Sequence, residues 1–224
     1  MLKIFKDNKV FYSLLLIYIV GGLWLTCAIP KGKMEVELNT HYTIELDYFF
    51  AFITNLGDGI FSVVIIILLF FRKIYYGILA AISFIISTIL VQSIKRFVFP
   101  DMPRPSVFLD KALPLHYVPD VEIYHAHSFP SGHTSGAFTI FLVLAIVFRN
   151  KYLDALFFML AFLVGLSRVY LLQHFFMDTY FGALIGVTTT LVVYYLTCYK
   201  ANWPENSRFN KSVINIFSRN EITS

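Results

Sequence analysis

Charged residues are scarce in this sequence. Asp, Glu, Lys and Arg make up 14% of its 224 residues, whereas soluble domains carry about 25%. Apolar residues make up 58%, and the mean hydropathy is +0.69. A charge deficit of this size does not fit a water-soluble domain, so the composition indicates a membrane protein. The net charge of +4 does not predict nucleic-acid binding, because Lys and Arg lie between apolar runs rather than in one basic patch.

Cysteine is also scarce. The two cysteines, Cys27 and Cys198, lie far apart in apolar stretches, and the sequence contains no Cys-x-x-Cys pair. No spacing of His and Cys suits a zinc site, so we expect two free thiols and no metal. Low-complexity segments, heptad runs and repeats of fixed period are absent as well. The chain is therefore neither a disulfide scaffold nor a coiled coil nor a repeat array.

Long apolar runs are the main feature of the sequence. A hydrocarbon core of about 30 Å requires about 20 apolar residues in a helix. We expect an all-α integral membrane protein in which residues 1–199 form six transmembrane helices and residues 200–224 form a short cytoplasmic tail. The fourth and fifth runs are short and should extend into their flanks. The six predicted spans are Val10–Ile29, Tyr48–Phe71, Ile74–Ile94, Thr134–Phe148, Tyr152–Leu166 and Thr179–Tyr199.

The distribution of basic residues predicts the orientation of these spans. If the N-terminus is cytoplasmic, eleven of the eighteen Lys and Arg residues fall on the inner side. The seven on the outer side are offset by eight Asp and Glu residues, as the positive-inside rule requires. All six histidines then fall on the outer side. The compact chain without outer glycosylation sequons favours a bacterial inner membrane, with the active site at the outer membrane face.

Groups suited to binding phosphate gather in the outer segments. A phosphoryl group in transfer carries negative charge on several oxygens, so its chemistry depends on positioning and electrostatic stabilisation. Lys95, Arg104 and Arg168 can supply positive charge and N–H donors. A Pro-Ser-Gly-His sequence opens the fourth span, where unpaired backbone N–H groups form an anion site. Within it, Ser131 adds a hydroxyl donor and Gly132 allows the backbone to approach a ligand.

Two histidines and one aspartate could carry the reaction. His174 and Asp178 are four residues apart and share one helix face, so the carboxylate can accept a hydrogen bond from one ring nitrogen. The other ring nitrogen is then free to act as a nucleophile. His133, from a different helix, could protonate the leaving oxygen. Together they predict phosphoryl transfer without a metal or cofactor.

These residues resemble the type 2 phosphatidic acid phosphatase family, which shares its site with the vanadium haloperoxidases. The second family motif, Pro-Ser-Gly-His, stands at residues 130–133. The third, Ser-Arg-x5-His-x3-Asp, stands in full at residues 167–178. The first, Lys-x6-Arg-Pro, is approximate, because eight residues rather than six separate Lys95 from Arg104. Arg96 is the competing candidate for the lysine position.

The resemblance covers residues 48–199 and implies a role for each motif residue. His174 is the implied nucleophile that becomes phosphohistidine, His133 the general acid, and Asp178 the partner that orients His174. The implied substrate is a lipid phosphate, such as undecaprenyl diphosphate, phosphatidylglycerophosphate or a lipid A phosphate, and no cofactor is expected. The alternatives are vanadate-dependent peroxidase chemistry and a lipid transporter or binding protein with a vestigial site. The implied phosphate-binding residues are Lys95, Arg104, Ser131, Gly132 and Arg168.

Several polar residues have no assigned role. Asp58 lies within the second apolar run near Asn55 and Gly57. An ionisable residue at such a depth is either functional or satisfied by a neighbouring helix, and the sequence does not distinguish the two. His125 and His127 precede the second motif, and we interpret them as solvated loop residues that could also touch a substrate headgroup.

Overall fold

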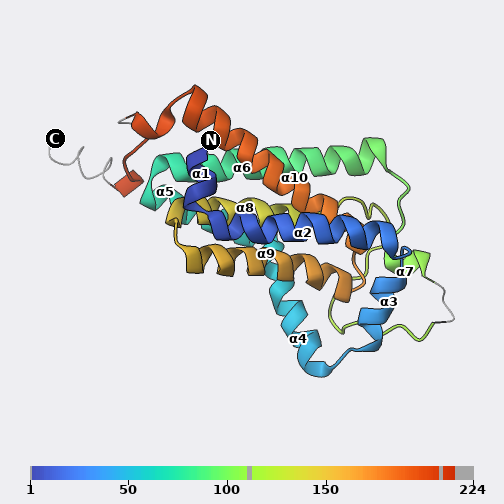
Figure 1. Ribbon diagram of the computed structural model, residues 1–224. Coiled ribbons are helices and arrows are strands. Elements are labelled where there is room, and N and C mark those ends of the chain that lie inside the picture. Colours follow the sequence, from blue (N-terminus) through green and yellow to red (C-terminus); the bar gives the residue numbers. More distant parts are fainter. Residues whose placement is uncertain (1, 110–112, 207–208, 215–224) are drawn as a thin grey trace.

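The computed structural model describes residues 2–109, 113–206 and 209–214, and the regular structure within these ranges is entirely helical (Figure 1). The longer helices lie roughly side by side, and the shorter α3 and α7 gather at one end of the bundle. The helices are α1 (Leu2–Asp7), α2 (Lys9–Ala28), α3 (Lys33–Thr40), α4 (Ile44–Ile53), η1 (Thr54–Gly57), α5 (Gly59–Arg72), α6 (Ile74–Ser93), η2 (Ile94–Val98), α7 (Pro105–Phe108), α8 (Gly132–Phe148), α9 (Lys151–Tyr170), α10 (Phe176–Tyr194), η3 (Tyr195–Lys200) and η4 (Trp203–Glu205).

Several helices are long and apolar enough to cross a membrane, which confirms an all-helical integral membrane protein. Four qualify alone, namely α2, α9, α6 extended by η2, and α10 extended by η3. The bent pair formed by α4–η1 and α5 makes a fifth candidate span. The predicted fourth span corresponds to α8, which has 17 residues and is about 25 Å long at 1.5 Å per residue.

The short helix α8 lies at the centre of the bundle. It packs against α6, α9 and α10, and every residue from Thr134 to Val147 is buried. A helix surrounded by other helices presents no side to lipid, so its length need not match the hydrocarbon thickness. Its position also explains why its sequence is apolar on all faces.

The second span is not the continuous helix that we predicted over Tyr48–Phe71. A break at Asp58 bends it by 52°, after a 3-10 turn over η1. Asp58 is extended (φ −76°, ψ 156°), and its side chain accepts a hydrogen bond from the backbone N of Gly59. Asp58 therefore caps α5, which favours the structural interpretation of this carboxylate.

Gly57 allows the break to pack against the core. A Cβ atom at this position would lie 2.5 Å from Cγ1 of Val164 and 2.9 Å from the backbone O of His133. We expect Gly57→Ala to destabilise the protein by about 1–3 kcal/mol and to reduce activity by displacing His133. Gly59→Ala is the matched control, because a Cβ there meets nothing within 4 Å. Melting temperatures in detergent would measure the difference, and equal melting of both variants would contradict the packing argument.

Glycine also brings the backbones of α8 and α10 together. A Cβ on Gly182 would lie 2.5 Å from the backbone O of Ser131, and one on Gly186 would clash with the backbone O of Ser135. This close packing fixes the beginning of α8 relative to the beginning of α10, where the predicted site residues lie.

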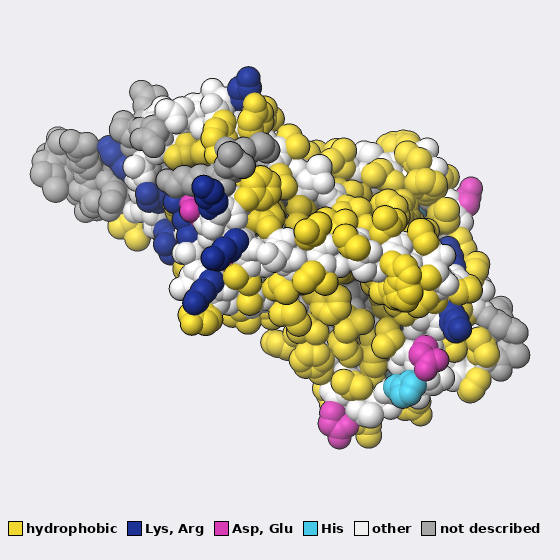
Figure 2. Space-filling model, viewed as in Figure 1, with side chains coloured by type: hydrophobic (Ala, Val, Ile, Leu, Met, Phe, Trp, Pro, Cys, Tyr) yellow, Lys and Arg dark blue, Asp and Glu magenta, His cyan; other side chains and the backbone are white. Residues whose placement is uncertain are grey.

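Part of the predicted tail packs against the bundle. The backbone N–H groups of Ile74 and Tyr75, at the start of α6, donate to the carbonyls of Lys211 and Phe209. The rest of the tail, residues 207–208 and 215–224, lies outside the described residues. In Figure 2, most of the visible Lys and Arg side chains gather at this end of the molecule, and the Asp, Glu and His side chains lie mainly at the other.

Candidate functional site

The predicted site residues come from four segments that meet at the end of the bundle near α3 and α7 (Figure 1). The backbone N of Ser131 donates to the backbone O of Asp178 at 2.9 Å, which joins the start of α8 to the first turn of α10. Nη1 of Arg104 donates to the backbone O of Gln173 at 2.9 Å, which joins the long loop to the turn between α9 and α10. All three sequence motifs therefore converge.

His174 and Asp178 form the predicted pair. Nδ1 of His174 lies 3.4 Å from Oδ2 of Asp178, and the two residues are 2% and 1% exposed. The same oxygen accepts hydrogen bonds from Oγ of Ser128 and from the backbone N of Phe175. With the proton on Nδ1 facing the carboxylate, Nε2 of His174 is the unprotonated nitrogen that a nucleophile requires.

The turn between α9 and α10 holds His174 in place. The backbone N–H groups of Gln173 and His174 both donate to the backbone O of Arg168, at 2.9 and 3.0 Å. Leu172 adopts a left-handed conformation with φ +53°, which is rare for a bulky residue and requires support from the surrounding structure. Arg168 and His174 are thereby kept adjacent.

The electrostatic environment keeps His174 neutral. Burial lowers the pKa of its imidazole well below the usual 6.5, and the positive charges of Lys95, Arg104 and Arg168 lower it further. These cations act on the ring from three different segments, since Lys95 lies in η2, Arg104 in the long loop and Arg168 in α9. A neutral imidazole surrounded by positive charge suits attack on an anionic group.

Arg168 has one donor that the described residues leave without a partner. Its side chain is 5% exposed, and Nη1 donates to Oγ1 of Thr54 at 2.7 Å. Nε of Arg168 has no hydrogen-bond partner among the described residues. A buried guanidinium N–H without a partner is unfavourable, and an oxygen of a bound phosphate would satisfy it.

Arg104 is held rigidly from three sides. Its Nε donates to the backbone O of Ala126 at 2.9 Å, and Nη1 also lies 3.3 Å from Oε1 of Gln173. The guanidinium lies 4.9 Å from the ring centre of Tyr124. Burial lowers the pKa of Arg104 below its usual range, but an arginine remains charged at neutral pH.

The start of α8 presents Ser131, Gly132 and His133. Oγ of Ser131 accepts hydrogen bonds from the backbone N and from Oγ1 of Thr134, at 3.4 and 3.0 Å. The serine hydroxyl thus caps the helix and can still donate its own proton. Gly132 and His133 line a cavity of about 200 Å³ between α5, α6 and α8, so His133 has access to space on the side facing α6.

Burial favours Lys95 over Arg96 at the lysine position. Lys95 is 8% exposed, whereas Arg96 is exposed. Both lie in η2, a π-helical turn that continues α6. In a π-helical turn the side chains point in other directions than they would in an α-helix. Lys95 therefore lies towards His174 although eight rather than six residues separate Lys95 from Arg104. Its role in binding phosphate stays a prediction.

The two histidines of uncertain role remain loop residues. Nδ1 of His125 lies 3.4 Å from Oγ of Ser106, and the side chains of His125 and His127 are exposed.

Three residues of the site were missed by the sequence motifs: Ser128, Gln173 and Thr54. Gln173 directly precedes His174, which could have indicated it, but nothing in the sequence marks Thr54. Within the described part of the chain, no group of three or more His, Cys, Asp and Glu side chains could hold a metal ion.

A family model described as the PAP2 superfamily matches residues 74–201, a range that contains every candidate site residue from Lys95 to Asp178. The chain belongs to the PAP2 superfamily. This confirms the resemblance that the motifs indicated, and it places the site geometry in the part of the chain that the family shares.

Similar proteins include members of known structure. A lipid A 4'-phosphatase from Porphyromonas gingivalis is 28% identical over 184 residues, which cover 76% of this PAP2 chain and 77% of that protein. The crystal structure of Aquifex aeolicus LpxE superimposes with a TM-score of 0.64 at 31% identity, covering 72% of this chain and 92% of that one. A PAP2-type phosphatidylglycerolphosphate phosphatase from Bacillus subtilis has the same fold, with a TM-score of 0.58 at 22% identity, covering 84% of this chain and 95% of that one.

Proposed function

We propose that this PAP2 protein is a lipid phosphatase that hydrolyses a phosphate monoester or diphosphate through a phosphohistidine on His174. The observation that carries this proposal is the buried, neutral His174, whose Nδ1 faces Asp178 while three cations act on its ring. A neutral nucleophile beside fixed positive charge is the arrangement that phosphoryl transfer requires.

In the proposed first step, Nε2 of His174 attacks phosphorus and the bond to the leaving oxygen breaks. The negative charge of the bound phosphate favours the protonated form of His133. His133 donates this proton to the leaving oxygen, and the lipid alcohol or lipid phosphate leaves. Asp178 stabilises the positive charge that develops on the imidazole ring. The transferring oxygens are held by Lys95, Arg104, Arg168, the hydroxyl of Ser131 and the backbone N–H groups at Gly132.

In the second step, a water molecule attacks the phosphohistidine from the opposite face. His133, now deprotonated, accepts a proton from this water. The N–P bond breaks, inorganic phosphate leaves, and His174 returns to the neutral state. Neither step requires a metal ion, so we propose a metal-independent enzyme.

The substrate class is proposed from the relatives and from the cavity beside His133. A lipid A 4'-phosphatase and a phosphatidylglycerolphosphate phosphatase are among the similar proteins, and undecaprenyl diphosphate is a third candidate. The cavity next to His133 lies between membrane-spanning helices. A headgroup phosphate could therefore reach His174 while its lipid chain stays between α5 and α6.

We also propose the topology. With α8 counted as a span, residues 1–199 cross the membrane six times, and the basic end seen in Figure 2 faces the cytoplasm. The site would then face the periplasm or the outside, in a bacterial inner membrane. Reaction of single introduced cysteines with a membrane-impermeant thiol reagent in intact cells would test this orientation.

The function is tested by phosphate release from a panel of lipids in detergent. We expect release from at least one of lipid A 1,4'-bisphosphate, phosphatidylglycerophosphate and undecaprenyl diphosphate, with activity unchanged by EDTA. Lack of release from all three, together with intact lipid transport in reconstituted vesicles, would instead support a transport protein with a vestigial site. Peroxide-dependent halogenation that responds to vanadate would support the peroxidase alternative.

A further inference from the structure

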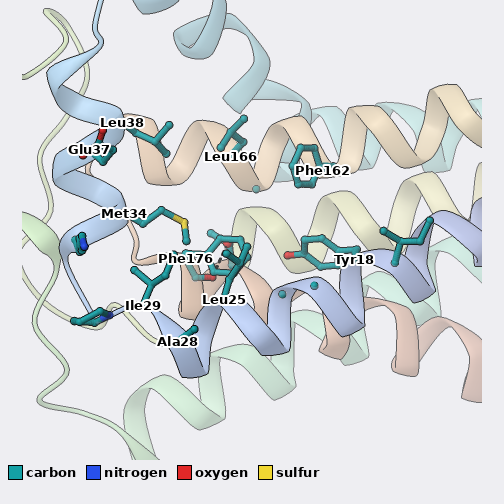
Figure 3. A pocket seen from close by; sticks show the side chains of 17 residues that line it. Tyr18, Leu25, Ala28, Ile29, Met34, Glu37, Leu38, Phe162, Leu166 and Phe176 are labelled. Carbon is teal, nitrogen blue, oxygen red and sulfur yellow. Dashed lines mark hydrogen bonds between the residues drawn. The ribbon is translucent and has the colours of Figure 1, made fainter.

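A second cavity is lined by other helices than the cavity beside His133. It has a volume of about 570 Å³ and is lined by residues of α2, α3, α9 and α10. In Figure 3, α2 and α9 form its two walls and α3 closes one end, with Met34 reaching in from α3 towards Phe176. The lining is almost wholly apolar, with Leu25, Phe162 and Leu166 among its residues. We call this cavity the α2–α9 groove.

The groove opens towards the hydrocarbon of the bilayer. Its walls are two of the candidate membrane spans, and Ile17 at its inner end is 68% exposed. From Ile17 to Ile29 the lining extends about 18 Å along α2, at 1.5 Å per residue. One leaflet contributes about half of a hydrocarbon core of about 30 Å. The groove therefore has the length of one leaflet, and an acyl chain is the occupant that can fill it without water.

The end of the groove carries charges of both signs. Lys33 and Glu37 line it from α3, and both side chains are exposed. They are four residues apart and so lie on one face of that helix. An ammonium and a carboxylate side by side complement a headgroup that has one phosphate and one ammonium, which is the chemistry of phosphatidylethanolamine.

The helix that closes the groove also holds the start of α10. Glu35 of α3 is 2% exposed, and its Oε1 accepts a hydrogen bond from the backbone N of Phe176 at 2.7 Å. Nζ of Lys31 lies 4.1 Å from the ring centre of Phe175. Because Phe176 lines the groove and lies two residues after His174, an occupant of the groove contacts the start of α10, directly after the turn that positions His174.

We propose that the α2–α9 groove binds a diacyl phospholipid with a zwitterionic headgroup, such as phosphatidylethanolamine, as a resident lipid that is not the substrate. One acyl chain lies between α2 and α9, and the headgroup lies against Lys33 and Glu37. The bound lipid stabilises the contact between α3 and α10 and thereby the position of His174. None of the predicted phosphate-binding residues lines this groove.

Gly21 offers a way to fill the groove. Gly21 lines it, and a Cβ at this position meets nothing within 4 Å, so Gly21→Trp places an indole in the space of the acyl chain. Leu23→Trp is the matched control, because Leu23 is 54% exposed on the same helix and does not line the groove. Both variants add an aromatic ring to α2, but only the first competes with a lipid.

Native mass spectrometry of detergent-purified protein measures the binding directly. Phosphatidylethanolamine should remain bound to the wild type and to Leu23→Trp, and its affinity for Gly21→Trp should fall at least about tenfold, because the acyl methylenes lose their burial. Equal retention by both variants would overturn the proposal. So would stoichiometric displacement by added lipid A 1,4'-bisphosphate, since the groove would then belong to the substrate.

The headgroup assignment has its own test. The double variant Lys33→Gln, Glu37→Gln should lose the preference for phosphatidylethanolamine over diacylglycerol, and an unchanged preference would contradict the assignment. Native mass spectrometry measures lipid binding without catalysis, so these outcomes do not depend on the proposed phosphatase activity. In delipidated wild type, added phosphatidylethanolamine should raise kcat for a lipid phosphate, whereas Gly21→Trp should not respond. If added phosphatidylethanolamine leaves kcat of the wild type unchanged, the bound lipid does not stabilise the position of His174.

Discussion

The His174→Ala variant is expected to lose phosphate release by about four orders of magnitude or more, because it removes the atom that attacks phosphorus. The side chain is 2% exposed, and its Nδ1 faces Asp178. Within the described part of the chain, His174 is the site histidine that has a carboxylate partner to fix its tautomer. The measurement is the initial rate of phosphate release in detergent, with the most active lipid of the panel.

The control for His174→Ala is a histidine on the same side of the protein that lies outside the site. His125 is exposed and lies next to Ser106, so His125→Ala should keep wild-type activity. Both variants should elute from size exclusion as the wild type does. Rapid quenching with phosphate-labelled lipid should give a labelled protein for the wild type and none for His174→Ala. More than a tenth of wild-type activity in His174→Ala would rule out the phosphohistidine route.

Much of the site could be predicted from the sequence because its key contacts are local. The four-residue spacing predicted that His174 and Asp178 lie close together, and the structure brings Nδ1 and Oδ2 within 3.4 Å. The predicted shared helix face is wrong, however, because His174 lies in the turn before α10 and only Asp178 lies on its first turn. The Pro-Ser-Gly-His sequence was expected to open the fourth span, and in the structure Ser131 directly precedes α8 and caps it by accepting from Thr134. In both cases the contact joins residues three or four positions apart, so the local path of the chain at a helix start decides it.

Contacts between distant segments could not be predicted in this way. Thr54 meets Arg168 across 114 residues, and Ser128 meets Asp178 across 50. Both depend on how the helices pack, and a single threonine or serine in a sequence carries no signal of that packing. Only the structure identifies these two residues as parts of the site.

The search for apolar runs also missed two local features of the chain, a break within one run and a polar helix between two runs. The bend at Asp58 separates two apolar helices, and a hydropathy window averages across the break. The helix α3 has mixed polarity and joins two spans, so a search for long apolar runs did not predict it. Yet Glu35 of this helix contacts the start of α10. The parts of the protein that sequence patterns describe least well are those that connect the membrane helices to the site.

Asp178→Asn should lower kcat by about 10³–10⁴-fold while leaving KM nearly unchanged, because a neutral amide cannot stabilise the imidazole as it becomes positively charged. Oδ2 of Asp178 accepts from Ser128, the backbone of Phe175 and His174. The amide oxygen of asparagine can retain the contacts to Ser128 and Phe175, so the start of α10 should stay folded. Asp178→Asn therefore changes the charge of this side chain and the tautomer of His174 more than it changes the position of either residue.

Ser128→Ala provides the graded comparison. It removes one neutral donor from the buried carboxylate, a loss of about 1–1.5 kcal/mol, and should reduce kcat by about tenfold. Both variants should melt within a few degrees of the wild type in detergent. If Asp178→Asn raises KM and leaves kcat unchanged, Asp178 binds substrate rather than orienting His174. If Ser128→Ala lowers kcat as much as Asp178→Asn does, the hydrogen bond from Ser128 positions the carboxylate. The charge of Asp178 then contributes less to catalysis than the position of its carboxylate does.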